Sequence, residues 1–315
     1  MGRVVDVATQ QPLEDVAITA RSPAAQREQV VLTDGAGAFR DPDLNPQSSC
    51  ELSLGGEYEI FGNARVGVTY LRRWMNDVIE DLSRDEGSTF FLGNPGRGIA
   101  SDFPQAKRTY DAAILSLTKT FSDLWLAQAS YTLAHLRGNW EGLYRPQTGQ
   151  LDPGSNSDFD LRSLTVNRYG PLAGDRRHEL KLFLARDVPI NNQHRLNLGG
   201  SYRARSGGPR SHLGSHVLYG LDEVFILPRG SGERLPWMHT IDAHLGYTLL
   251  QTEARTLSFA LDAFNLFDFA AVVARSQRYT TRDVEPITGS AADSPFVNGD
   301  RRQIDPARIT PADGD

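Results

Sequence analysis

The sequence contains two histidines four residues apart, His212 and His216, a spacing that could ligate a metal ion. On a helix, residues at this spacing share one side and can bind the same ion. Here they lie in SHLGSH, within a glycine-rich stretch that predicts a loop. Without a third ligand, two loop histidines do not predict a metal site. We therefore predict no metal and no cofactor.

Asp242, His244 and Asp262 could share proton-transfer chemistry if strand pairing brought them together. A catalytic trio would also need a nucleophile, and the chain has no Gly-x-Ser-x-Gly motif. The glycine-rich stretch GNPGRG at 93–98 lacks the Lys-Ser/Thr pair of a phosphate-binding loop. These residues predict hydrogen bonds on a polar sheet face and an ordinary loop, so we do not expect an enzyme.

Composition narrows the class of protein further. The chain has 315 residues, 39% of them hydrophobic, and a net charge of −6, which gives no basic excess for binding nucleic acid. Cys50 is the single cysteine, so no disulfide can form within the chain. No apolar run approaches the roughly 18 residues of a membrane-spanning helix. The start, MGRVVDVATQ, lacks the basic and apolar regions of a signal peptide.

Long stretches of alternating apolar and polar residues dominate the chain after about residue 50. In 194–206, Leu196, Leu198 and Tyr202 share one face, while arginines occupy the other. Eight segments of this kind predict strands, at 52–60, 65–74, 111–121, 125–135, 178–189, 194–206, 239–250 and 255–269. Strands of globular proteins average about five or six residues, whereas membrane-crossing strands need about nine to eleven. The length of these segments favours membrane-crossing strands.

The connections between these strands alternate in length. Turns of a few residues join the strands of each pair, and long links at 82–106, 138–176 and 207–237 join the pairs. Outer-membrane barrels have short periplasmic turns and long outer loops, while soluble domains rarely tolerate structureless loops of this length. Aromatic residues occupy the apolar faces, several near strand ends, as at a lipid–water boundary: Tyr58, Tyr70, Trp74, Trp125, Tyr131, Tyr202, Tyr247 and Phe267.

The fold class predicted here is all-β, with an antiparallel outer-membrane β-barrel portion of about eight long strands. In this arrangement the apolar faces meet lipid and the arginines face the lumen. The alternative is a soluble β-sandwich binding module in which the apolar face is a dry core. That alternative predicts that Leu196, Leu245 and Phe259 meet in one interior.

The first forty-five residues have a different pattern. Short predicted strands occur in RVVDV, EDVAITA and QVVLTD, and DGAG predicts a tight turn before Phe39. The stretches TQQPLEDVAITA and TDGAGAF resemble the carboxypeptidase-regulatory-like module, a small Ig-like sandwich. Because Ig-like folds need about 100 residues, the resemblance implies a partial module over 1–45.

The combination resembles the TonB-dependent outer-membrane receptors, most of all the Oar-like branch, in which such a module precedes the plug. The stretches that carry the resemblance are PQSSCELSLGGEYEI, SRDEGSTFFLGNPGRGIA, GDRRHELKLFLARDVP, GGSYRARSG and DAFNLFD. It implies a receptor-like barrel segment over 46–280 and an irregular tail over 281–315 that lacks the closing strand. Such receptors have about 22 strands and a plug. We therefore expect a shortened or internally deleted receptor, joined near 41–46.

The resemblance implies a function and a set of partners. Full-length relatives take up large ligands or serve adhesion in the outer membrane, driven by the TonB energy-coupling complex, although no TonB box is seen here. The partners expected are therefore outer-membrane lipid, that complex for the full-length relative, and an unknown ligand. Outer loops catch the ligand in such receptors, which implies contact residues in 138–176: Trp140, Tyr144, Asp158 and Phe159. The chain alone is not expected to transport.

A second membrane interpretation remains beside the receptor fragment. Eight strands are enough to close a small barrel, which would then have a structural or adhesive role.

Overall fold

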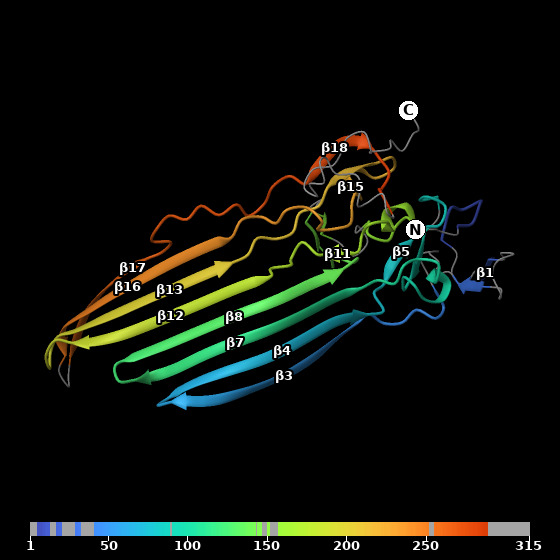
Figure 1. The fold of residues 1–315 in the computed structure, drawn as a ribbon. Coiled ribbons are helices and arrows are strands. Elements are labelled where there is room, and N and C mark those ends of the chain that lie inside the picture. Colours follow the sequence, from blue (N-terminus) through green and yellow to red (C-terminus); the bar gives the residue numbers. More distant parts are fainter. Residues whose placement is uncertain are drawn as a thin grey trace.

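The structure is a computed structural model of the chain. It describes residues 5–12, 17–20, 29–32, 41–88, 90–142, 144–146, 150–151, 157–251 and 255–288. Figure 1 shows long strands side by side in one layer, with the longer connections gathered at one end. No helix within the described ranges is long and apolar enough to cross a membrane.

Eight long antiparallel strands form the main sheet, each hydrogen-bonded to the next along the chain in the order β17-β16-β13-β12-β8-β7-β4-β3. The strands are β3 (Ser48–Phe61), β4 (Ala64–Asn76), β7 (Arg108–Ser122), β8 (Trp125–Gly138), β12 (His178–Pro189), β13 (Arg195–Arg205), β16 (Met238–Gln251) and β17 (Thr256–Ala263). Seven of them have 11 to 15 residues. All eight predicted strands are therefore present, in the predicted pairs.

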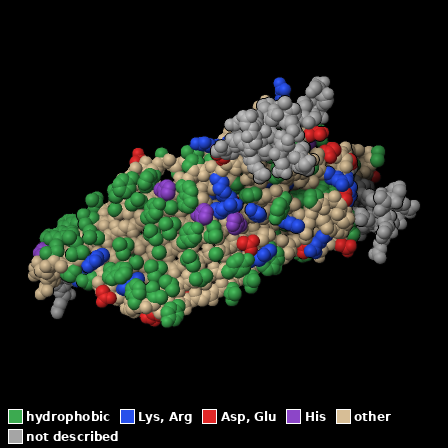
Figure 2. Space-filling view, in the orientation of Figure 1, with side chains coloured by type: hydrophobic (Ala, Val, Ile, Leu, Met, Phe, Trp, Pro, Cys, Tyr) green, Lys and Arg blue, Asp and Glu red, His purple; other side chains and the backbone are tan. Residues whose placement is uncertain are grey.

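The two faces of this sheet differ in chemistry because side chains alternate along every strand. The pairing places Leu182, Tyr202 and Ile241 in one row and Lys181, Arg203 and Thr240 in the next. We call the first the apolar face and the second the polar face. Figure 2 shows hydrophobic side chains gathered over the strands.

The apolar face is not covered by another layer. Leu245 is 44% exposed and Phe259 is 60% exposed. The interior in which the sandwich hypothesis would bury both is therefore not found, and within the described ranges the long strands form a single layer. Contiguous apolar surface of this extent marks contact with lipid or another molecule.

The sheet is open rather than closed. β3 and β17 lie at its two edges, and neither has a second strand neighbour in the part of the chain that the structure describes. The all-β antiparallel prediction is confirmed, but a closed barrel is not formed by these strands.

Tight turns join the strands at the end opposite the long loops. Between β7 and β8, Asp123 and Leu124 both have positive φ, 52° and 68°, and Ser122 pairs with Trp125 across them. Positive φ at both central residues is typical of type I′ hairpin turns, whose twist matches that of the strands. Between β12 and β13, the Asn191 side chain accepts hydrogen bonds from the backbone N–H groups of Gln193 and His194, both at 2.9 Å.

The long connections form a second structured region, which we call the loop assembly: the described parts of 77–107, 139–177, 206–237 and 270–288. It contains β5 (Glu80–Leu82), β6 (Phe91–Gly93), β9 (Tyr144–Arg145), β10 (Gln150–Leu151), β11 (Gly170–Pro171), β14 (Leu213–His216), β15 (Gly220–Phe225), β18 (Arg278–Asp283) and the 3-10 helices η1 (Gly98–Ala100) and η2 (Ser163–Thr165). β11 pairs with the end of β8 and ties the assembly to the main sheet. The long links predicted between the strand pairs are therefore present, and they contain short strands that long-range contacts hold together.

The last long strand is shorter than predicted. β17 ends at Ala263, and the chain turns at Asn265, which has a positive φ of 49°. The Asn265 backbone N–H donates to Asp242 Oδ1 at 2.9 Å, and its side-chain oxygen accepts from the Phe269 N–H at 3.1 Å. Phe267 therefore lies beyond the strand, not on its apolar face as predicted.

The two ends of the chain are described in part. β1 (Ala17–Ala20) and β2 (Gln29–Leu32) pair antiparallel, inside two of the short strands predicted for 1–45. β18 includes the first three residues of the predicted 281–315 tail, and residues 289–315 lie outside the described ranges. Neither observation tests the proposed module or the proposed tail.

A short segment before β3 is fixed to the loop assembly. Asp41 is buried, and its Oδ2 accepts the Ile99 backbone N–H at 3.1 Å. Asn45 exchanges hydrogen bonds with the Asn94 side chain, at 2.8 and 3.1 Å. Asn94 also donates to the carbonyl of Val78, so this segment enters β3 from the loop end of the sheet.

Candidate ligand-contact region in the loop assembly

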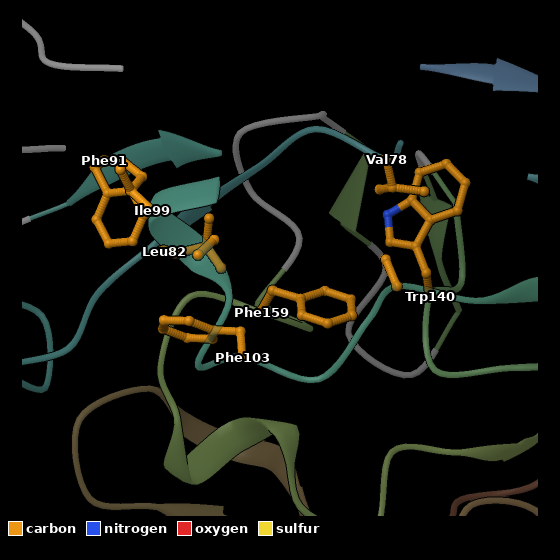
Figure 3. Close-up of a cluster of buried hydrophobic side chains, with 9 residues drawn as sticks. Val78, Leu82, Phe91, Ile99, Phe103, Trp140 and Phe159 are labelled. Atoms are coloured by element: carbon orange, nitrogen blue, oxygen red, sulfur yellow. The ribbon is translucent and has the colours of Figure 1, made fainter. Parts of the chain in front are cut away.

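The loop assembly has an apolar core of its own. Figure 3 shows its main cluster, which includes Val78, Leu82, Phe91, Phe103, Trp140 and Phe159. Phe91 and Phe103 pack edge to face with ring centroids 6.4 Å apart, an arrangement that aromatic rings favour. Trp140 and Phe159, both predicted to contact ligand, are buried here rather than presented at the surface.

A second, smaller core lies under β15 and β18. It is made of Val224, Ile226, Leu227, Val284 and Ile287. Asn167 donates to the carbonyls of Phe225, Ile226 and Ile287 at 3.2, 3.1 and 3.0 Å. Segments from three of the connections are thereby held together.

Three buried arginines and three buried acids link the 139–177 and 206–237 connections. We call them the arginine cluster: Arg145, Arg168, Arg229, Glu141, Asp158 and Glu223. Asp158 is 0% exposed. Its Oδ1 accepts from Arg229 Nη2 at 3.0 Å and from Arg168, and its Oδ2 accepts the backbone N–H of Glu141 at 3.0 Å.

The other two acids complete the cluster. Arg229 Nη1 donates to Glu141 Oε2 at 2.8 Å, and Arg145 pairs with Glu223. The guanidinium carbons of Arg168 and Arg229 lie 5.0 and 4.7 Å from the centroid of the Phe225 ring, within cation–π range. Because charges of both signs are matched and hydrogen-bonded, their burial is tolerable.

The electrostatics of the cluster follow from this packing. Burial by itself raises the pKa of Asp158, but Arg229, Arg168 and Arg145 outweigh it and hold the pKa well below its usual range. Burial and the neighbouring Arg145 lower the pKa of Arg168 to about 10, which leaves it charged at neutral pH. Asp158 is therefore the anionic centre of the cluster, and its role is to fix two connections together.

A group of acids beside the arginine cluster behaves in the opposite way. Burial raises the pKa of Glu80 to about 9, although the Trp140 indole N–H donates to its carboxyl group. Burial and the charge of Asp81 raise the pKa of Asp160 to about 7, against the hydrogen bond that it accepts from the Tyr219 hydroxyl at 2.8 Å. At neutral pH Glu80 is therefore neutral, and Asp160 is near its titration midpoint.

Of the four predicted ligand-contact residues, Tyr144 alone presents its side chain to solvent. It lies in β9 and is 49% exposed, while the next residue, Arg145, points into the arginine cluster. The structure therefore brings Trp140, Asp158 and Phe159 together as interior residues and leaves Tyr144 at the surface. Ligand contact by any of the four stays a prediction.

The other residues that the sequence singled out have local partners. His216 Nδ1 accepts the Leu218 N–H at 3.2 Å, and His212 packs edge-on against Tyr279. No group of three or more metal-ligating side chains is found in the residues that the structure describes. On the polar face, His244 lies 2.7 Å from Asp262, and Asp242 accepts the Ser201 hydroxyl at 2.9 Å.

The polar face also carries a hollow of about 530 Å³. Residues at polar-face positions of neighbouring strands line this hollow, among them Gln128, Ser130, Lys181 and Arg203. Side chains of this kind can hold water or polar ligand groups, which suits the inside of a water-filled passage.

Sequence reasoning missed the residues that organise the loop assembly. Arg145, Arg168 and Arg229 stand in polar, glycine-containing segments with no periodic pattern. Two of these arginines have acidic partners that are distant in sequence: Glu223 is 78 residues from Arg145, and Glu141 is 88 residues from Arg229. Two glycines in the sequence were a partial signal of close packing here. A Cβ atom at Gly170 or Gly207 would collide with the backbone oxygen of Arg229 or Leu235, respectively.

Two-faced long strands joined by short turns at one end and long connections at the other are typical of outer-membrane β-barrel proteins. The chain is 50% identical over 249 residues to the TonB-dependent transporter Oar of Myxococcus xanthus. This alignment includes 79% of the chain and 24% of that relative. The chain is thus a partial Oar-like TonB-dependent transporter sequence, spanning about a quarter of its relative's length.

No family model and no solved structure matches the chain. TonB-dependent transporters sit in the outer membrane, and the matched relative is named as a transporter rather than as an enzyme.

Proposed function

We propose that this chain is a wall-and-loop segment of an Oar-like outer-membrane receptor. The apolar face meets lipid, the polar face lines the receptor's interior, and the loop assembly lies outside the cell, where it offers surface to a ligand. The observation that carries this proposal is an uncovered apolar face along eight long strands, in a chain that is 50% identical to a TonB-dependent transporter.

The physical basis of this proposal is that the exposed apolar face is better solvated by lipid hydrocarbon than by water. Three leucines on this face, Leu54, Leu184 and Leu261, are more than half exposed. Burial of apolar area is worth about 25 cal/mol per Å², so water is a poor solvent for such a face and hydrocarbon is a good one. The backbone of an inner strand is hydrogen-bonded on both sides, which a bilayer also requires.

We propose that the chain does not transport on its own, because the described sheet is open and encloses no lumen. Energised uptake of a large ligand or adhesion, with coupling to TonB, is proposed for the whole receptor. Closure of the eight strands into a small barrel is the second candidate, and it would require β3 to pair with β17. Heat-dependent mobility on a gel is the expected sign of that closure.

Membrane flotation tests the proposal. The full chain, expressed with an added signal peptide or refolded with vesicles, is expected to float with lipid and to resist carbonate extraction. A soluble monomer that stays at the bottom of the gradient without detergent would contradict it.

A graft tests the part of the proposal that concerns the whole receptor. Residues 46–280 would replace the matched segment of the Myxococcus xanthus relative. Outer-membrane insertion of the graft, with recovery of the relative's own activity, is the expected result. Failure of the graft to insert would show that these strands do not fit a receptor wall.

A further inference from the structure

The apolar face is not uniform. A groove of about 690 Å³ crosses β8, β12, β13 and β16, and it is lined almost entirely by apolar atoms. Small residues lie within it, including Ala127, Gly200 and Ala243, which occupy one row of the sheet together with Leu184. A Cβ atom at Gly200 would meet no heavy atom closer than 3.7 Å. The hollow is therefore open space above the backbone.

A charged residue lies at the turn end of this groove. Arg186 lines the groove and is exposed, and the pairing places it beside Trp125 and Leu198. Within the described part of the chain, no ion pair or hydrogen bond engages its guanidinium group. An unpaired cation on a lipid-facing surface is unfavourable unless it meets an anion.

The neighbouring cation shows the contrast. The Lys119 ammonium donates to the carbonyls of Thr120 and Ser122, at 3.0 and 3.2 Å, and lies 4.7 Å from the centroid of the Trp125 ring. Lys119 is therefore satisfied within the protein, whereas Arg186 is available to an external anion.

The position of Arg186 fits a lipid headgroup. Trp125 is the first residue of β8, and tryptophans favour the membrane–water boundary. Arg186 pairs with Trp125 across β8 and β12, so it lies at the same level of the sheet. Leu182, four residues earlier in β12, lies at the other end of the groove. At about 3.3 Å per residue the groove runs for about 13 Å along the strand, close to half of a hydrocarbon core about 30 Å thick.

We propose that this groove binds one phospholipid of the turn-side leaflet, with an acyl chain over Gly200 and Ala243 and its phosphate on Arg186. Guanidinium groups bind phosphate through paired hydrogen bonds, and the part of an acyl chain nearest the headgroup fits the length and apolar lining of the groove. The inference rests on the membrane orientation given under Proposed function.

Lipid retention tests the inference with matched variants. The full chain is floated with vesicles of phosphatidylcholine and phosphatidylglycerol, released into mild detergent, and titrated with phosphatidylglycerol while native mass spectrometry counts bound lipids. Gly200→Leu fills the groove and Arg186→Gln removes the charge. Gly56→Leu is the control for bulk on the apolar face, since a Cβ atom there meets nothing within 4 Å. Arg137→Gln is the control for loss of an exposed arginine at the loop end of β8.

The unaltered chain is expected to retain one phospholipid. Arg186→Gln should weaken phosphatidylglycerol binding about tenfold, the size of one lost charge-assisted contact. Gly200→Leu should weaken it by a similar factor because the leucine side chain occupies the groove, while both controls bind as the unaltered chain does. Equal binding by Gly200→Leu, or equal losses in the controls, would overturn the inference. So would a dimer that Gly200→Leu dissociates, because the groove would then seat a second copy.

Flotation separates this inference from the proposed function. A chain that floats with vesicles but retains no phospholipid contradicts the groove alone. A chain that does not float contradicts both.

Discussion

The main sheet and the loop assembly differ in where they place their apolar side chains. The sheet is one layer thick, and residues such as Leu245 and Phe259 remain exposed on it. The loop assembly buries its apolar side chains and even its charges, with Arg145, Arg168 and Asp158 almost wholly inaccessible. The apolar face of the main sheet is left to contact its surroundings, whereas the loop assembly has a buried core of its own. A single chain thus combines a surface suited to lipid with a compact region suited to water.

The largest expected effect is in the arginine cluster. Asp158→Asn removes the central anion and leaves Arg168 and Arg229 short of a partner in the interior. Breaking a buried ion pair from one side costs about 3–5 kcal/mol. Hydrogen exchange should show the loop assembly opening while the long strands stay protected.

The control for this substitution is Glu59→Gln, an exposed residue of β3. It should change stability by less than about 0.5 kcal/mol. If Asp158→Asn opened the long strands as readily as the loops, the two regions would not be independent.

The second effect concerns the sheet. Leu182→Arg places a charge on the apolar face, and Gln128→Arg places the same charge on the polar face of the neighbouring strand. A charge facing the bilayer midplane costs about 2–4 kcal/mol, whereas lumen-facing substitutions are tolerated. The free energy of folding into vesicles should fall for Leu182→Arg alone. Equal losses for the two variants would show that the faces do not meet different solvents.

The third effect is a pH dependence confined to the loop assembly. The pKa values of Asp160 and Glu80 are raised to about 7 and about 9. In the unfolded chain both groups lose their protons near pH 4, so the folded state binds more protons between pH 4 and 9. Their contribution to stability is complete below about pH 4 and is lost as the pH rises through 7 and 9.

Denaturant unfolding at pH 5.5 and 8.5 measures this loss, which should be several kcal/mol, because each pH unit between a group's unfolded and folded pKa values is worth about 1.4 kcal/mol. Glu80→Gln keeps an acceptor for the Trp140 indole N–H and cannot ionise, so it should flatten the upper part of the profile. An unchanged profile in this variant would remove Glu80 from the explanation.

The smallest effect is expected at Tyr144. Because its side chain is half exposed, Tyr144→Ala should alter stability by less than about 0.5 kcal/mol. Trp140→Ala, four residues earlier, removes a core ring and should cost about 3–5 kcal/mol. Thermal unfolding of the two variants compares them. A large loss for Tyr144→Ala would place that residue in the interior of the loop assembly.

The same contrast explains what the sequence could and could not predict. The alternation in 194–206 predicted β13, its faces and its partner strand, because side-chain alternation is a local property of a strand. The buried position of Trp140 involves a hydrogen bond to Glu80, 60 residues earlier. No local sequence pattern predicts that contact. Asp158 was singled out as an acid in an outer loop, whereas its surroundings are set by arginines from two connections.

The end of β17 shows an intermediate case. Apolar residues continue beyond Ala263, with Phe264, Leu266 and Phe267, and so the sequence predicted a longer strand. Asn265 ends the strand by adopting a positive φ and by bonding to Asp242 of the adjacent strand. Asparagine tolerates this conformation better than most residues do, which was a local signal that the apolar pattern outweighed.

The attachment of Asp41 and Asn45 to the loop assembly fixes this segment at the loop end of the main sheet. In the proposed orientation, a tag placed ahead of residue 41 would be within reach of antibodies on intact cells. A tag inserted in the tight turn at Asp123 would be reached only after the cell envelope is opened. Labelling of these two sites would therefore establish the sidedness of the whole segment without any knowledge of its ligand.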